Sequence, residues 1–198
     1  MNKSISNRVR YGLAYLQAGV FTLLFSNMVW IPYVHAGPDG ESYNHNEGNI
    51  TRNGTTTTIN QNVQNMAIDW KTYNVGSSER VQYVQPNSSS ISLNRIADVN
   101  GSTIQGRIDA NGQVILMNPH GVTFSSGSVL NVGGLIATSL NMTNEDFMNG
   151  KYQLTQDPDG FGTVINHGII NAAVGGNVAL IGKHVENTGL ISAKLGSV

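Results

Sequence analysis

The stretch that decides the fold is Asn111-Gly-Gln-Val-Ile-Leu-Met-Asn-Pro-His-Gly-Val122. Its opening Asn-Gly is a strong turn dipeptide, because both residues tolerate positive φ. The apolar run at 114–117 has the length of a short strand and no polar face, which is typical of a strand covered on both sides. The Asn-Pro-His-Gly sequence at 118–121 then ends the strand, since proline removes a donor and glycine permits a left-handed backbone. The stretch therefore predicts a turn, a buried strand and a second, tighter turn.

The first 36 of the 198 residues have the pattern of a secretory signal. Basic residues precede a mostly apolar segment at 18–31, and small residues follow at Val34-His-Ala36. This arrangement predicts cleavage between Ala36 and Gly37. A transmembrane anchor is the alternative, but the apolar segment is short and is interrupted by Ser26 and Asn27. We expect a single mature domain at 37–198.

Charge and cysteine content narrow the possible partners. After Ala36 the chain has 8 basic and 12 acidic residues, a formal net charge of −4. No basic patch is present, which argues against nucleic acid or an anionic membrane surface as a partner. The chain has no cysteine, so disulfides and thiolate metal sites are excluded. Its 23 glycines and 12% charged residues are typical of short strands and tight turns.

Residues past Val122 begin to repeat at a fixed distance. Gly168–Asn171 matches Gly189–Ser192 at an offset of 21 residues, and 112–116 resembles 176–180 at an offset of 64, about three such periods. A period near twenty with aliphatic residues between glycine corners predicts an all-β parallel β-helix. A β-sandwich has similar turn spacing but no recurrence at a long fixed offset.

Alternating segments before the central stretch predict strands and a core. They lie at 67–75, 81–84 and 90–96, and in the last of these we expect Ile91, Leu93 and Ile96 to point inward. The predicted structural core consists of Trp70, Tyr73, Tyr83, Leu93, Val114 and Leu116.

One insertion is expected to interrupt the winding. Thr143 precedes acidic residues, which predicts a helical turn. Tyr152–Gln156 and Phe161–Ile165 flank the turn residues Asp157-Pro-Asp-Gly160, which predicts a β-hairpin outside the coil.

The candidate chemistry is sparse. Three histidines show no ligand spacing with one another, namely His120, His167 and His184. A β-helical polysaccharide enzyme would need two carboxylates held on a rigid face. The four candidate acids lie in the predicted turn and hairpin, where acids usually serve as caps and turn residues: Glu145, Asp146, Asp157 and Asp159. We predict no catalytic residue, no metal and no cofactor.

The ordered motifs of the chain resemble the N-terminal secretion domain of two-partner secretion exoproteins, the family of filamentous haemagglutinins and high-molecular-weight adhesins of Gram-negative bacteria. The motifs are Ala67-Ile-Asp-Trp-Lys-Thr-Tyr-Asn-Val75, Val81-Gln-Tyr-Val-Gln-Pro86, Leu93-Asn-Arg-Ile96, Asn111-Gly-Gln-Val and Asn118-Pro-His-Gly-Val122. The resemblance implies a right-handed parallel β-helix with an N-terminal cap and a flanking hairpin. It also implies recognition in the periplasm by the POTRA domains of a partner outer-membrane β-barrel, which exports the exoprotein to the cell surface or the medium.

The secretion motif departs from the family pattern at two positions. The family signature is Asn-Pro-Asn-Gly-Ile, and here His120 and Val122 replace the second Asn and the Ile, while Asn118, Pro119 and Gly121 remain. Family members continue for many more coils, so the chain is expected to be a fragment that stops in mid-coil. Contact with a host receptor or glycan would then lie in the missing part. The alternative function is a free-standing extracellular β-helical adhesin or carbohydrate-binding module.

Overall fold

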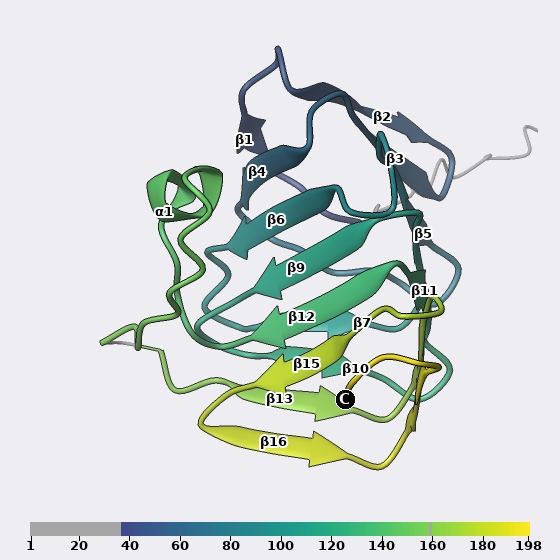
Figure 1. Cartoon of the computed structure of the whole chain (residues 1–198). Coiled ribbons are helices and arrows are strands. Elements are labelled where there is room, and N and C mark those ends of the chain that lie inside the picture. Colours follow the sequence, from purple (N-terminus) through teal and green to yellow (C-terminus); the bar gives the residue numbers. More distant parts are fainter. Residues whose placement is uncertain (1–36, 159) are drawn as a thin grey trace, which may run out of the picture. The chain divides into compact units, whose positions relative to one another are not determined.

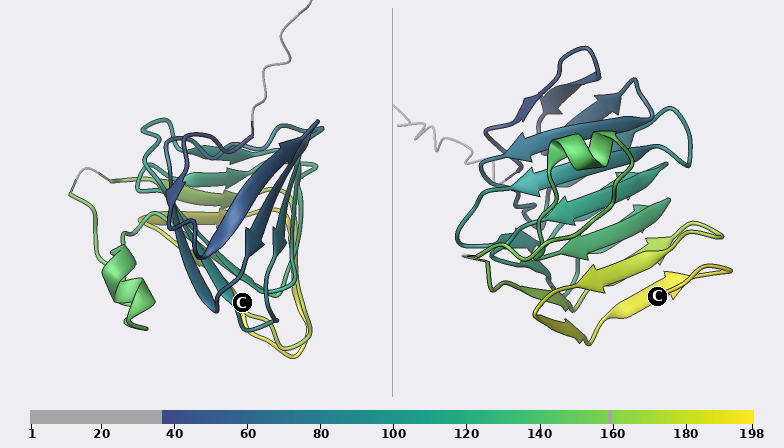
Figure 2. Two further views of the ribbon diagram at one scale, coloured as in Figure 1. Left: turned by 90° about the horizontal axis from the view of Figure 1, so that it is seen from above. Right: turned by 60° about the vertical axis from the view of Figure 1, so that its left-hand side comes forward.

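A computed structural model describes residues 37–158 and 160–198. The predicted signal segment, Ala36 included, lies outside the described residues. The described chain winds into a parallel β-helix in which three sheets surround the core (Figure 1). Seen along the axis, the coils have a triangular outline (Figure 2). The predicted parallel β-helix is confirmed.

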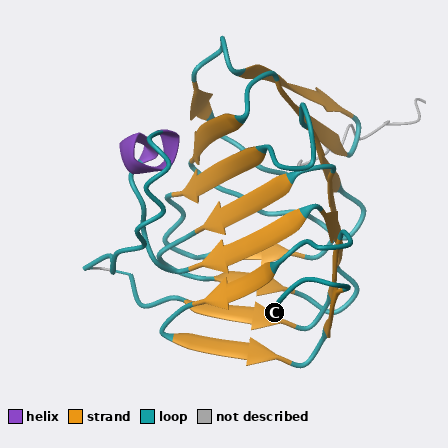
Figure 3. Ribbon diagram, in the orientation of Figure 1, coloured by secondary structure: helices purple, strands orange, loops and turns teal. Residues whose placement is uncertain are grey.

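Among the described residues, 17 strands and one helix are present (Figure 3). The six-stranded sheet contains, in spatial order, β1 (Ser42–Tyr43), β4 (Asn65–Trp70), β6 (Ile91–Ile96), β9 (Gln113–Met117), β12 (Gly134–Thr138) and β15 (Val178–Ile181). The four-stranded sheet contains β16 (His184–Asn187), β13 (Thr163–Asn166), β10 (Val122–Phe124) and β7 (Ser102–Ile104). The seven-stranded sheet contains β17 (Leu190–Ala193), β14 (Ile169–Ala172), β11 (Val129–Val132), β8 (Arg107–Ala110), β5 (Arg80–Val84), β3 (Thr56–Gln61) and β2 (Gly48–Asn53). The helix α1 spans Asn144–Met148.

Each complete coil takes one strand from each sheet, as β9, β10 and β11 do. Parallel pairing places equivalent residues of successive coils side by side, so Leu93 lies beside Ile115, and Ile115 beside Ile136. The sequence repeat is confirmed, because Ile169 of β14 pairs with Leu190 of β17.

A stack of glycines forms one corner of the coil. The Gly133 N–H donates to the Gly112 carbonyl at 2.7 Å, and a Cβ on Gly176 would lie 2.0 Å from the Gly133 oxygen. Gly112 and Gly176 are therefore two coils apart. The expectation of about three periods is wrong, because the second of these coils contains the insertion.

Antiparallel strands close the N-terminal end of the β-helix. β1 runs antiparallel to β4, and β2 runs antiparallel to β3, which pairs in parallel with β5. Gly54 has φ of +55° in the turn between β2 and β3, a conformation that glycine adopts at little cost. These strands provide the N-terminal cap that the resemblance implies.

The interior contains an aromatic cluster near the cap. The rings of Trp70 and Tyr73 meet edge to face at 5.5 Å between centroids, and the Tyr73 and Tyr83 hydroxyls are 2.7 Å apart. Val114 and Leu116 of β9 belong to the same interior core. The apolar run of β9 is buried throughout, because Ile115 and Met117 point to the opposite face, where a second cluster covers them.

The inward orientation expected for Ile91 and Leu93 is wrong. Leu93 is fully buried, but it packs with Phe147 on the outer face of the six-stranded sheet. The residues of β6 that point inward are Ser92, Asn94 and Ile96, two of them polar. Alternation could not reveal this, because both faces of the strand are covered.

The insertion, residues 139–162, is called the excursion below. Its helix begins as predicted, with the Asp146 N–H donating to the Thr143 hydroxyl at 3.0 Å. The predicted hairpin does not form: Tyr152–Gln156 has no strand, only an isolated bridge between Asn141 and Thr155. The residues at 163–166 instead form β13 inside the coil, where Val164 is fully buried. Continuing the ladder from β10 buries these side chains, which an outlying hairpin would leave in water.

Candidate functional site

The Asn118–Gly121 turn, called the motif turn below, lies at the corner where the chain passes from β9 to β10. The Asn118 side chain is fully buried and its amide makes two hydrogen bonds. Its Oδ1 accepts from the His120 N–H at 2.9 Å, and its Nδ2 donates to the Ser102 hydroxyl at 3.1 Å. An asparagine amide has both an acceptor and a donor, so it can accept from its own turn and donate to the neighbouring coil at once.

The backbone of Asn118 ties the same corner to the next coil. Its N–H donates to the Thr138 carbonyl at 3.0 Å, and its carbonyl accepts from the Gly121 N–H at 2.9 Å. Gly121 has φ of +109°, and a Cβ there would lie 2.6 Å from the Thr163 oxygen. Glycine is therefore required for both conformation and space.

The excursion returns to the coil directly against the motif turn. The Gly162 N–H donates to the Pro119 carbonyl at 2.9 Å. A Cβ on Gly162 would lie 2.1 Å from the Gly121 nitrogen, and one on Gly160 would lie 2.6 Å from the Pro119 Cβ. Sequence reasoning missed this contact. The only signal for it was the two glycines that flank Phe161.

His120 lies partly exposed on this corner, and its Nδ1 is buried without a hydrogen-bond partner among the described residues. Val122 is fully buried in β10. The motif turn thus exposes parts of Pro119 and His120, while Asn118, Gly121 and Val122 are buried. In the folded domain its contacts form the corner and join it to the excursion.

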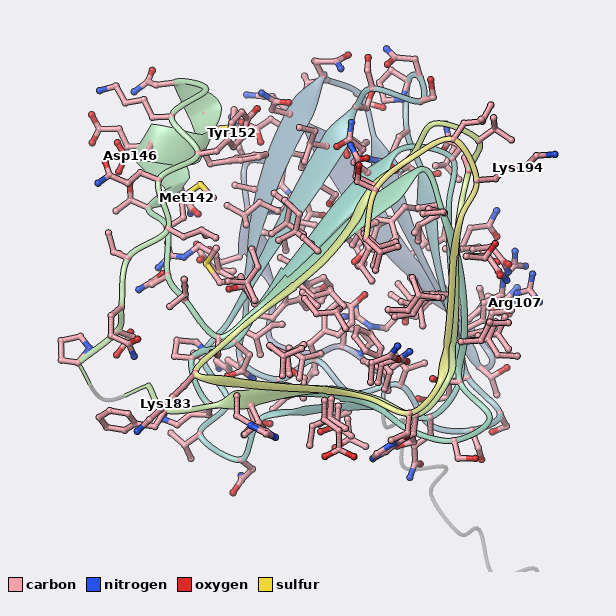
Figure 4. The ribbon with its side chains drawn as sticks, turned by 60° about the horizontal axis from the view of Figure 1, so that its bottom comes forward. Arg107, Met142, Asp146, Tyr152, Lys183 and Lys194 are labelled. Atoms are coloured by element: carbon pink, nitrogen blue, oxygen red, sulfur yellow. The ribbon has the colours of Figure 1, made fainter. Side chains whose placement is uncertain are left out.

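The excursion covers an apolar area on the outer face of the six-stranded sheet (Figure 2). Met142 and Phe147 pack there on Leu93, Ile115 and Met117. Figure 4 shows Met142 between the excursion and the sheet, on the side opposite Arg107. The Asn144 amide fixes the helix to β4 by donating to Asp69 Oδ2 at 2.9 Å.

The six predicted core residues are buried. Trp70, Tyr73, Tyr83, Val114 and Leu116 lie inside the coil, and Leu93 lies under the excursion. Gly37 is the first described residue and lines a shallow cavity with Asp39, Thr72 and Asn74.

Asp159 lies outside the described residues, and the other candidate histidines and acids are not assembled into a reactive centre. His167 is at the corner after β13, where its Nδ1 contacts the Thr188 hydroxyl, and His184 opens β16 beside Thr163. Within 37–158 and 160–198, no group of three or more His, Cys, Asp or Glu residues is placed to hold a metal. Asp146 accepts from the Thr143 hydroxyl at 2.8 Å, a capping interaction.

A cavity of about 180 Å³ adjoins the motif turn, and Asp69, Arg95, Pro119 and Asp157 are among its lining residues. The two acids have other partners. Arg95 Nη1 is 3.4 Å from Asp69 Oδ1, and the Asn141 amide donates to Asp157 Oδ2 at 3.4 Å. Asp69 and Asp157 therefore take part in polar contacts beneath the excursion and do not face each other as an acid and base pair.

No helix within the described part of the chain has the length and apolar character needed to cross a membrane.

The comparisons agree with this architecture. Residues 34–197 match the TPS secretion domain. Two heme/hemopexin-binding proteins of Haemophilus influenzae are each 38% identical to this chain, over 105 and 112 residues. These alignments cover 53% and 55% of this chain but only 12% of each relative.

A solved structure has the same fold. The crystal structure of the HMW1 secretion domain from Haemophilus influenzae superposes with a TM-score of 0.74 and 33% identity. The match covers 78% of this chain and 42% of the other. Because the family match spans nearly all described residues, the chain belongs to the TPS secretion domain family of two-partner secretion exoproteins.

Proposed function

We propose that residues 37–198 are the secretion-signal domain of a filamentous haemagglutinin-like adhesin, recognised in the periplasm by the POTRA domains of a partner outer-membrane β-barrel. The observation that carries the proposal is the family match over 34–197. Membership implies a two-partner outer-membrane transporter and secretion through the periplasm to the surface or the medium. Residues 1–36 act in this proposal as the signal peptide, cleaved by signal peptidase between Ala36 and Gly37 after delivery by the general export machinery.

The domain carries no reaction in this proposal. The family is not a catalytic one, and the cavity beside the motif turn contains paired rather than free acids. Recognition would instead use main-chain pairing, since strand addition to a sheet edge gives affinity without a preformed pocket.

The motif turn could act in one of two ways, by shaping the fold or by contacting the transporter directly. Asn118 is fully buried in the folded coil, so a folded domain cannot present this side chain to a transporter. We assign Asn118 and Pro119 to shaping the corner first. Contact between the Asn118 side chain and the transporter would require the corner to be unfolded at the time of recognition, whereas Pro119 and His120 are partly exposed in the folded turn.

The test is co-expression in a Gram-negative host with and without a two-partner transporter, followed by measurement of the chain in medium and periplasm. Release that depends on the transporter supports the proposal. Retention, with a transporter that still exports its own partner, would contradict it and favour a free-standing β-helix, for which glycan binding is the next measurement.

Asn118→Ala and Asn94→Ala form a matched pair for the motif. Both remove a fully buried amide with partners in the coil. If only Asn118→Ala blocks release at equal stability, the motif has a role in recognition. Equal release of the two variants would limit Asn118 to the fold.

A further inference from the structure

The sheets have six edge strands within the described residues, and β2 is the longest. It has six residues, whereas β1 has two, β7 three, and β15, β16 and β17 four each. The outer side of β7 is already covered, since the Val75 N–H donates to the Thr103 carbonyl at 3.1 Å and the Gln105 N–H donates to the Val75 carbonyl at 2.7 Å. At the N-terminal end, β2 is therefore the main edge with room for another strand.

One hydrogen bond identifies the backbone groups of β2 that point outward. β2 pairs only with β3, and Ile50 lies opposite Ile59. The Ile50 N–H donates to the Tyr43 hydroxyl at 3.2 Å instead of to β3. Because outward groups alternate along an antiparallel strand, the backbones of Gly48 and Arg52 face the same side.

A short segment covers this edge through side chains alone. The segment Pro38–Tyr43 is called the strap below. Arg52 donates to both carboxylate oxygens of Glu41, at 2.8 and 2.6 Å, and to the Pro38 carbonyl at 2.8 Å. The side chains of Arg52 and Glu41 are 31% and 21% exposed. Partly exposed ion pairs contribute little stability, so β2 itself holds the strap weakly. On its other side the strap pairs with β4 through β1, and the Asp39 backbone bonds to Lys71 and Thr72. This pairing is absent until β4 has formed.

The sequence of β2 itself has little of the usual protection of an exposed edge, because its one charged residue, Arg52, is engaged by the strap. Gly-Asn-Ile-Thr-Arg-Asn at 48–53 contains no proline and no lysine, the residues that commonly block pairing with another chain. The strand also belongs to the most local pairing of the fold, a hairpin closed at Gly54. Hairpins form in microseconds, whereas the coil pairs join residues about twenty positions apart. The hairpin can therefore exist before the coils do.

We propose that the outward edge of β2 is the docking site for an extended strand of the transporter's periplasmic domains, open before the strap has paired with β4. This inference rests on the proposed function. An isolated two-stranded hairpin is marginally stable in water, and a third strand would stabilise it. A carboxylate on the incoming strand would take the place of Glu41 beside Arg52. A second copy of this chain is a poorer occupant, because pairing two β2 edges requires the release of two straps.

The test compares two substitutions at one residue in the full chain, co-expressed with the transporter. Arg52→Ala removes the Arg52 contacts with the strap and keeps the outward N–H. Arg52→Pro removes the same contacts and also this N–H, a loss that edge strands tolerate because the N–H faces away from β3. We expect release into the medium to fall about tenfold with Arg52→Pro and to stay within about twofold of wild type with Arg52→Ala.

The outcomes separate the two proposals. If the wild type and Arg52→Pro are released equally with the transporter, the docking site is wrong and the secretion role stands. Absence of transporter-dependent release of the wild type would remove the secretion role itself. Concentration-dependent dimers of the wild type that Arg52→Pro abolishes would show a second copy at the edge and would also overturn the inference.

A crosslinking measurement keeps the inference testable if Arg52→Pro does not fold. A photocrosslinking amino acid is placed at Asn53 at the end of β2, or at Asn187 on the distant strand β16, both exposed. The inference expects an adduct with the periplasmic domains from position 53 only. An adduct from position 187 alone, or equal adducts from both, would contradict it.

Discussion

Asn94 organises the interior polar network at the scale of single residues. Its Oδ1 accepts from Trp70 Nε1 at 3.0 Å and from the Tyr83 hydroxyl at 2.9 Å, and its Nδ2 donates to the Ser92 and Ile115 carbonyls at 3.2 Å each. A fully buried amide is stable only when its bonds are made, and here all four are. The network therefore fixes the aromatic cluster to β6.

Asn94→Leu should destabilise the fold strongly. The leucine has a similar volume but leaves the Trp70 N–H and the Tyr83 hydroxyl without an acceptor, at a cost of about 2–4 kcal/mol. Urea unfolding measures the difference. Asn62→Leu, at an exposed position, is the control and should change stability by less than about 0.5 kcal/mol. Equal effects would show that the network contributes nothing specific.

The paired tyrosines predict a loss of stability in alkali. The Tyr83 hydroxyl gives its hydrogen to Asn94, so the Tyr73 hydroxyl donates to Tyr83. Burial raises the pKa of both phenols above the unfolded value of about 10. A raised folded pKa favours the fold fully below pH 10, and this stability is lost as the pH rises further.

Tyr73→Phe should therefore reduce the dependence of stability on pH. Above pH 10, each buried tyrosine contributes a slope of up to about 1.4 kcal/mol per pH unit, and the variant loses one such contribution. Unfolding free energies at pH 9 to 11 test this, with Tyr152→Phe in the exposed excursion as the control. An unchanged slope in Tyr73→Phe would contradict the assignment.

At the scale of elements, the sequence predicted those turns, caps and repeats that depend on neighbouring residues or on fixed offsets. The Asn118–Gly121 corner, the Thr143 cap and the repeat of Gly168–Asn171 all follow from turn chemistry or fixed offsets. The face on which Leu93 packs did not follow, because its cover includes Phe147, far along the chain. The predicted hairpin failed for a related reason, since 163–166 pairs with β10 across the excursion.

Phe147 is the large, fully buried side chain of the excursion. It is fully buried on the outer sheet face and meets Tyr152 edge to face at 6.0 Å. Removing a buried phenylalanine side chain costs about 3–5 kcal/mol, which should weaken the docking of this element by up to that amount. Phe147→Ala should speed tryptic cleavage after Lys151 by on the order of 100-fold while the coil stays folded.

Met148→Ala is the matched control, because Met148 is the next residue of α1 and is 42% exposed. Its cleavage rate should stay near that of wild type. If Phe147→Ala instead lowers the unfolding temperature of the coil and leaves cleavage unchanged, the excursion and the coil unfold together as one unit.

At the scale of the whole molecule, burial varies along the axis of the β-helix. The side chains of β9 and β12 are buried on nearly all positions, since the interior covers one face and the excursion the other. Those of β16 are all exposed, and β17 has no buried residue. In a linear array each coil is stabilised mainly by its neighbours, so this difference is not averaged over the molecule.

Hydrogen exchange should therefore follow the axis. We expect the amides of β9 to exchange only through global unfolding and those of β17 to exchange at least about a thousandfold faster, through local opening. Residue-resolved exchange by NMR measures both. Uniform protection from β4 to β17 would contradict the gradient and show one cooperative unit.

The same measurement tests the hairpin of β2 and β3. The Gln61 amide of β3 donates to the carbonyls of Val63, Gln64 and Ile91, and the last of these bonds joins the hairpin to β6. Protection of β3 near that of β9 would show that the folded coil holds the hairpin, and that strand addition at β2 has to occur before the coils close.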